Sequence, residues 1–430
     1  MSELTEQIPV VGRRRLPRIP RRSRPARPLD VDGRPSVGAR LFGLGSIFGK
    51  SLRDARRATL LAGLGYGFIV FVTASQLAAE FGSATARAAI ATLPTQLPAI
   101  FRGMLGEPIN VAALGGFLSW RSLNFVPVIL GAWSITVLSG TLAIDARRGS
   151  LDLIGTTGHS RDGIAVQKAS AHVVAVAVAA LIVGLFIYVA GLLFATLPGD
   201  EVTLSAALSH AVWLWLMTLF PGAVAWLVAP VVGRGAAAGL GALVLVVSFV
   251  VHGYKDSIAA FGSIDTFSYF GLTAGHRPIA GVTDWGSMAA LAVIELALLV
   301  GGILVFRTRD IGITVDVGLP LPRFRLGLGG PLGRSFAERL SVAWWWGIGL
   351  GLIGFVFALN IDAFVGTLKS IPQVETMIRR LYPDADIFSA GGVLQLVFFG
   401  FGSLVVAAAA GMLANGWASD ETERRLETIL

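Results

Sequence analysis

Glu295 is the one carboxylate deep inside an apolar run of this sequence, about nine residues from either end of Met288–Phe306. An acid in the hydrocarbon region of a membrane is costly and tends to face a helix-bundle interior or a cavity. One interpretation is that Glu295 lines a transport path and attracts a cationic substrate. The other is structural, with a protonated or hydrogen-bonded side chain packing against a neighbouring helix.

The stretch GLGSIFGKS (Gly43–Ser51) imitates a phosphate-binding Walker A loop. That loop needs a glycine, four residues and then Gly-Lys-Ser. Counted back from Gly49, the position that should be the first glycine is Leu44. We therefore expect no nucleotide binding and no enzymatic activity in this chain. The sequence has no cysteine, and its five histidines form no metal-binding motif, so we expect no cofactor of its own.

The composition predicts that membrane-spanning helices position Glu295 and the other residues named above. Hydrophobic residues make up 54% of the 430 residues and charged residues only 14%, against roughly 25% charged in soluble domains. A helix needs about 20 apolar residues to cross a bilayer, and only helices satisfy the backbone within one segment. We expect an all-α polytopic membrane protein. The predicted spans are Leu60–Leu77, Phe125–Ile144, Val173–Ala195, Ala211–Val228, Ala236–Val251, Met288–Phe306, Val342–Ile361 and Gly391–Leu413.

The distribution of Lys and Arg predicts the orientation. With the N-terminus inside, 27 of the 35 basic residues lie in cytoplasmic segments and 8 in outer ones. The net charge of +8 therefore indicates orientation and contact with anionic membrane lipids, and we expect no nucleic-acid partner. We divide the chain into a disordered basic tail (1–40), a six-span unit with an elbow helix over Ser46–Thr59 (41–306), a cytoplasmic linker (307–340) and a second unit (341–430).

The second unit repeats the beginning of the first. Asp145 corresponds to Asp420, Leu151 to Leu426, and Asp152 to Glu427, all at one spacing along the chain. The second copy has only two spans before Leu430, so we expect the natural chain to continue, or a separate polypeptide to supply the remaining spans.

Two outer regions carry further expectations. Residues 80–118 and 362–390 are too polar to span and are interpreted as short surface helices, with ordinary loops as the alternative. His252, Lys255 and Asp256 follow the fifth span and are predicted to form a solvated cap.

The loop after the second span resembles the cytoplasmic loop of ABC-2 type (type-2 exporter) permeases. The segment ARRGSLDLIGTTGHSRDGIAVQK carries that family's order of Gly, Leu-acid-Leu, Ser-Arg and a Lys at the start of the next span. It departs from the family at GTTGHSR, where a Thr-Pro step is usual. The resemblance covers most of residues 40–430 and is closest to long, duplicated, twelve-span antibiotic and multidrug exporter permeases.

This resemblance implies a duplicated six-helix unit, incomplete in its second copy, in a bacterial cell membrane. It also implies a pair of separate ATP-binding subunits that hold ATP and Mg and hydrolyse the nucleotide, while this chain exports lipophilic compounds. The residues that would couple to those subunits are Asp145, Arg148, Gly149, Leu151, Asp152, Ser160, Arg161 and Lys168, with Asp420, Glu423, Leu426 and Glu427 in the second repeat.

Two other classes remain open. A carrier driven by an ion gradient usually has intramembrane charges at matching positions in its two halves. Here the position that would match Glu295 falls past Leu430. A membrane scaffold or lipid-modifying enzyme is the third class, and an enzyme would require a cluster of His, Asp or Glu at one membrane face, which the sequence does not show.

Overall fold

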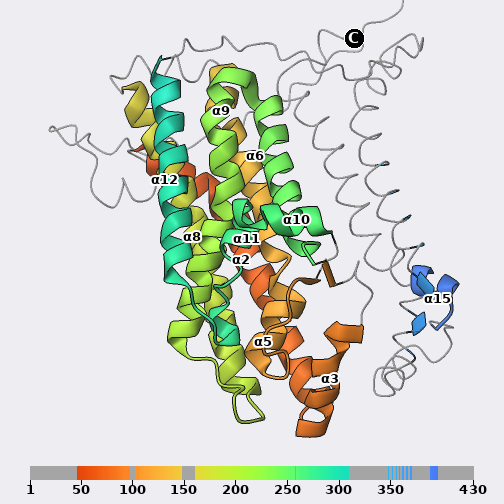
Figure 1. The fold of residues 1–430 in the computed structure, drawn as a ribbon. Coiled ribbons are helices and arrows are strands. Elements are labelled where there is room, and N and C mark those ends of the chain that lie inside the picture. The colour runs from red at the N-terminus through yellow and green to blue at the C-terminus, as the bar shows by residue number, and fades with distance from the viewer. Residues whose placement is uncertain are drawn as a thin grey trace, which may run out of the picture.

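The computed structural model describes residues 46–96, 102–103, 105–147, 160–256 and 258–308, with scattered positions between 347 and 395. Within these residues the secondary structure is helical except for an isolated bridge between Arg277 and Val282 (Figure 1). The elements are α2 (Ile47–Glu80), α3 (Ala84–Gln96), α5 (Leu114–Leu118), η1 (Ser119–Leu123), α6 (Val126–Arg147), α8 (Arg161–Phe194), α9 (Leu204–Gly253), α10 (Ala259–Ile264), η2 (Asp265–Phe267), α11 (Tyr269–Leu272), η3 (Pro278–Ala280), α12 (Trp285–Thr308) and α15 (Ala390–Gln395).

Four helices, α2, α8, α9 and α12, are long and apolar enough to cross a membrane. A bent pair, Leu114–Leu123 with Val126–Thr141, adds a fifth span if it is counted as one, and its two parts meet at 44°. The π-helical turn η1 lies directly before this bend, as expected for a local interruption of regular helical bonding. The prediction of a helical polytopic membrane protein is confirmed for the described residues.

Helix α9 is two antiparallel arms joined at Gly233. A straight helix of its 50 residues would be about 75 Å long. Gly233 instead has φ 77° and ψ 171°, a conformation that only glycine adopts without strain. Beyond it the chain folds back onto the first arm. The close approach of the two arms is seen at Gly241, where a Cβ would lie 2.7 Å from the Pro221 carbonyl oxygen. The arms, residues 204–232 and 234–253, contain the predicted fourth and fifth spans.

The first arm of α9 is the centre of the bundle. It has buried side chains all around its circumference, and α6, α8, α12 and its own second arm pack against it. Helix α2 packs along α8, where a Cβ at Gly63 would lie 2.9 Å from Ile182 Cβ. Small residues here let the helix backbones approach closely, as in membrane helix pairs. The elbow predicted over Ser46–Thr59 is continuous with the first span, because α2 is a single helix from Ile47 to Glu80.

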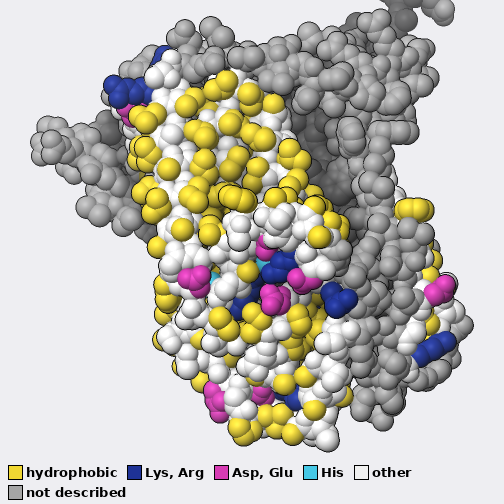
Figure 2. Space-filling model, viewed as in Figure 1, with side chains coloured by type: hydrophobic (Ala, Val, Ile, Leu, Met, Phe, Trp, Pro, Cys, Tyr) yellow, Lys and Arg dark blue, Asp and Glu magenta, His cyan; other side chains and the backbone are white. Residues whose placement is uncertain are grey.

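The outward faces of the long helices are apolar. Large exposed hydrophobic side chains recur at helical spacing on α2, α8, α12 and the second arm of α9, for example Leu61, Leu64 and Phe68 on α2. On the face shown in Figure 2, hydrophobic side chains gather over α12 and the second arm of α9, and charged side chains lie below them and at the upper end of α12. Such a surface suits lipid and not water.

The two ends of the bundle differ. The Ser160 end is where α2 and α8 begin and α6 and α12 end. The Asp200 end holds α3, α5 and the turn between α8 and α9. There Arg87 of α3 forms a buried two-point ion pair with Asp200, with Nη1–Oδ1 and Nη2–Oδ2 distances of 3.2 and 3.1 Å. The short helix α3 agrees with the expectation of a helix within residues 80–118.

Candidate functional site

Ser160 begins α8 at the end of the charged loop. Its backbone is extended, and its Oγ accepts a hydrogen bond from the Gly163 N–H at 3.1 Å. A serine at this position satisfies one of the N–H groups that the first helical turn leaves unpaired. Arg161 is therefore the first residue of α8, and its side chain is exposed.

Three contacts attach the first turns of α8 to three other helices. The Phe48 N–H of α2 donates to Gln167 Oε1 at 3.3 Å. Lys168 Nζ donates to the Thr141 carbonyl oxygen of α6 at 3.4 Å. Arg307 of α12 lies 3.7 Å from Asp162, and since both side chains are well exposed, this pair contributes little stability.

An apolar cluster beneath these contacts provides most of the attachment. It joins Ile164, Ala165 and Ala169 of α8 to Leu138, Trp226 and Phe306 of α6, α9 and α12. Burial of such side chains stabilises by about 25 cal/mol per Å². A force applied to the segment before Ser160 would therefore act on several helices together.

The structure brings only part of the predicted coupling loop into view. Ser160, Arg161 and Lys168 lie as just described. Asp145 is in the last turns of α6, but only its backbone is described. Arg148, Gly149, Leu151 and Asp152 lie outside the described residues, as do the second-repeat residues Asp420, Glu423, Leu426 and Glu427.

Glu295 faces the bundle interior, as its burial to 3% exposure shows. It belongs to the buried face of α12, which also includes Met288, Leu291 and Gly302. Its Oε1 atom has no hydrogen-bond partner among the described residues. The sequence prediction that this carboxyl points inward is confirmed.

The segment 258–284 returns from α9 to α12 and packs against the first arm of α9. Arg277 lies over Trp213, with its Cζ 4.8 Å from the indole centroid, and its Nη1 donates to the carbonyl oxygens of Thr273 and His276. Burial lowers the pKa of Arg277 to about 10, so the guanidinium is charged at neutral pH. Tyr269 stacks on Phe220 at 4.7 Å.

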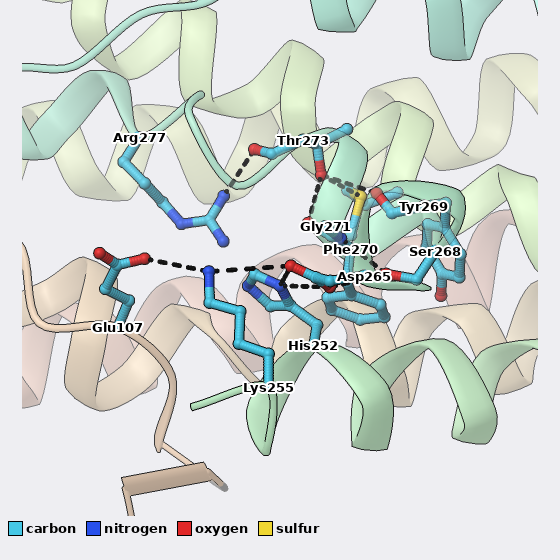
Figure 3. Close-up of polar contacts among 11 residues, drawn as sticks. Glu107, His252, Lys255, Asp265, Ser268, Tyr269, Phe270, Gly271, Thr273 and Arg277 are labelled. Carbon is cyan, nitrogen blue, oxygen red and sulfur yellow. Dashed lines mark hydrogen bonds and ion pairs between the residues drawn. The ribbon is translucent and has the colours of Figure 1, made fainter. Parts of the chain in front are cut away.

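The predicted solvated cap after the fifth span is wrong for His252. Its Nδ1 lies 3.0 Å from Asp265 Oδ1, and the ring is 7% exposed. Lys255 lies between Glu107 and Asp265, at 3.6 and 3.7 Å from their carboxylates (Figure 3). Segment 258–284 supplies Asp265, so residues distant in sequence cover the histidine.

Sequence reasoning missed the aromatic and ionic residues of these packed segments. Arg87, Asp200, Trp213, Tyr269 and Arg277 follow no motif. The one available signal was that all of these residues except Trp213 are polar or aromatic residues in segments between predicted spans; Trp213 lies within the predicted span Ala211–Val228.

The described helices define a polytopic α-helical membrane protein. Residues 328–430 match a protein-family model described as "Multidrug efflux system permease Rv1217c, C-terminal domain". Nearly all of that region lies outside the described residues. No curated protein matches the chain. The match, together with the apolar helices, indicates a transport permease.

Proposed function

We propose that this chain is the permease subunit of an ATP-driven exporter of lipophilic compounds, of the ABC-2 multidrug type, in a bacterial cell membrane. The observation that carries the proposal is the attachment of the first turns of α8 to α2, α6 and α12 directly after the charged loop. The similarity of residues 328–430 to a multidrug efflux permease supports the substrate class.

In this proposal the Ser160 end faces the cytoplasm and two ATP-binding subunits dock on the loop between α6 and α8. ATP and Mg bind to those subunits, and this chain contributes no residue to hydrolysis. The 34 residues of α8 make it about 51 Å long, so a tilt of about 5° moves its far end by about 4 Å. A helix held at the docking end transmits such a tilt across the membrane.

The charges around the loop suit a docking surface. Arg161 and Asp162 begin α8, and Arg148 and Asp152 precede them in the sequence. Complementary charges at such a surface favour specific orientation and fast association. The acidic residues Asp420, Glu423 and Glu427 of the second repeat would face the second ATP-binding subunit.

Co-purification of the full chain from its native membrane tests the proposal. We expect an ATP-binding protein to accompany it and ATPase activity to depend on both. Arg161→Glu should weaken that association severalfold, because it reverses an exposed charge at the docking end. Arg102→Glu is the matched control. Arg102 is exposed, and its neighbour Gly103 lies against Gly253 at the C-terminal end of α9, away from Ser160. Equal loss with both variants, or no nucleotide-binding partner, would contradict the proposal.

A carrier driven by an ion gradient is the alternative, and the buried acid Glu295 favours it. Vesicles containing the chain alone separate the two functions. Transport that follows an imposed ion gradient without nucleotide supports the carrier, and transport that requires ATP and the partner supports the exporter.

A further inference from the structure

Eight buried side-chain nitrogen and oxygen atoms lack a hydrogen-bond partner among the described residues, and two of them are relevant here. One is Oε1 of Glu295 in α12, and the other is the hydroxyl of Tyr269 in α11. Both residues are 3% exposed. Buried polar groups in proteins are nearly always hydrogen-bonded, and leaving one unpaired costs about 1–3 kcal/mol. The Glu295 carboxyl and the Tyr269 hydroxyl would both gain a partner if one molecule bound between them.

The two groups come from different elements and lie at the same level of the bundle. Trp226 Nε1 donates to the Leu299 carbonyl oxygen at 3.1 Å, which fixes α12 beside the first arm of α9. The two helices run in the same direction, so Glu295, one turn before Leu299, lies roughly beside Phe220. Tyr269 stacks on Phe220 with ring centroids 4.7 Å apart.

The electrostatics agree with this register. Burial raises the pKa of the Tyr269 phenol well above its usual value, and the nearby Glu295 carboxyl adds to the rise. Glu295 forms no ion pair with any described residue, so no cationic side chain in this part of the protein neutralises it. The buried cation Arg277 lies over Trp213, about two turns before Phe220 in α9.

We propose that Glu295 and Tyr269, with the aromatic wall of Phe220, bind a lipophilic organic cation. The inference rests on the proposed export function and names its substrate class. A carboxylate in an apolar setting attracts a single positive charge strongly. The faces of aromatic rings attract cations as well, by about 0.5–2 kcal/mol each. The apolar surroundings suit the hydrocarbon part of such a molecule.

Equilibrium binding of radiolabelled tetraphenylphosphonium to the purified full chain tests the site. This cation carries a permanent charge, and triphenylphosphine oxide is a neutral analogue of similar shape. We expect saturable binding of the cation, reduced about tenfold or more by Glu295→Gln and about threefold by Tyr269→Phe. Weak binding of the neutral analogue should not change. Glu80→Gln is the matched control, because Glu80 is exposed at the end of α2.

A second measurement on the unaltered chain avoids dependence on the folding of the variants. Dicyclohexylcarbodiimide modifies carboxyl groups in apolar surroundings, and mass spectrometry locates the product. We expect modification of Glu295 and protection by tetraphenylphosphonium. Absence of protection, or cation binding unchanged by Glu295→Gln, overturns the proposal and leaves Glu295 a packing residue.

Neither binding measurement needs nucleotide or a partner subunit. If the chain binds the cation but no ATP-binding subunit accompanies it, the site stands and the ATP-driven function fails. If ATPase coupling is present and the cation does not bind, the function stands and the substrate class fails.

Discussion

The buried pair Arg87–Asp200 should be the strongest polar contact at the Asp200 end. Both side chains are at most 2% exposed. Asp200 also accepts backbone hydrogen bonds from Leu114 at 2.7 Å, Thr196 at 3.2 Å and Leu197 at 3.1 Å. The carboxylate therefore joins α3, α5 and the turn between α8 and α9.

Asp200→Ala removes the acceptor and leaves a buried guanidinium and three N–H groups without it. Removing one partner of a buried pair costs about 3–5 kcal/mol. Three unpaired N–H groups at about 1 kcal/mol each give a similar value. Arg87→Ala should cost less, because the backbone donors still stabilise the carboxylate.

Titration of the detergent-solubilised chain with sodium dodecyl sulfate, followed by circular dichroism, measures the free energy of unfolding. The double variant Arg87→Leu/Asp200→Leu should be more stable than Asp200→Ala, because no charge is left buried alone. Removing the exposed pair Lys50–Asp54 is the control and should cost less than about 1 kcal/mol. A cost below about 1 kcal/mol for Asp200→Ala, or strictly additive single effects, would refute this account.

Three further predictions concern local structure. Gly233→Val should destabilise the α9 hairpin by about 1–3 kcal/mol, because valine is strained at φ 77°, and an unchanged detergent titration would contradict this. Ser160→Ala should cost about 1 kcal/mol through loss of the α8 cap and increase hydrogen exchange of the first turn, whereas Ser160→Asp should preserve both. His276 Nδ1 accepts the Asp284 N–H at 3.0 Å, and burial lowers the pKa of His276 below its usual 6.5. Stability from the neutral ring is therefore complete above about pH 6.5 and declines as the pH falls toward the lowered pKa, and His276→Gln should remove this part of the pH dependence of unfolding.

Sequence patterns predicted the helices because apolar length is a property of single segments. The spans Ala211–Val228 and Ala236–Val251 fall in the two arms of α9, and the predicted break between them contains Gly233. The inward orientation of Glu295 also followed from one segment, since a carboxyl on the lipid face would be very costly.

Contacts between distant segments could not be predicted in this way. His252 looked solvated because its sequence neighbours are charged, but Asp265 covers it from a segment that folds back onto α9. The partner of Arg87 is 113 residues away, and no local pattern relates the two. Tyr269 looks like an ordinary loop aromatic until the packing of α11 places it on Phe220.

If the loop before α8 is the docking loop of the proposed function, the contacts at the two ends of α8 indicate how its movement would cross the protein. At the Ser160 end the helix is held to α2 by the Phe48–Gln167 bond, and Gly63 lets it pack closely along α2. At the Asp200 end the turn that follows α8 holds Arg87, whose Nε also donates to the Phe81 carbonyl oxygen just after α2. Helices α2 and α8 are thus joined at both ends and should tilt as one body. Because α12 is joined to the start of α8 through Phe306 and Arg307, such a tilt would also move α12 and change the packing around Glu295. In the proposed function, rigid coupling at the ends with adjustable packing between them would let a movement of α8 reach the interior of the bundle.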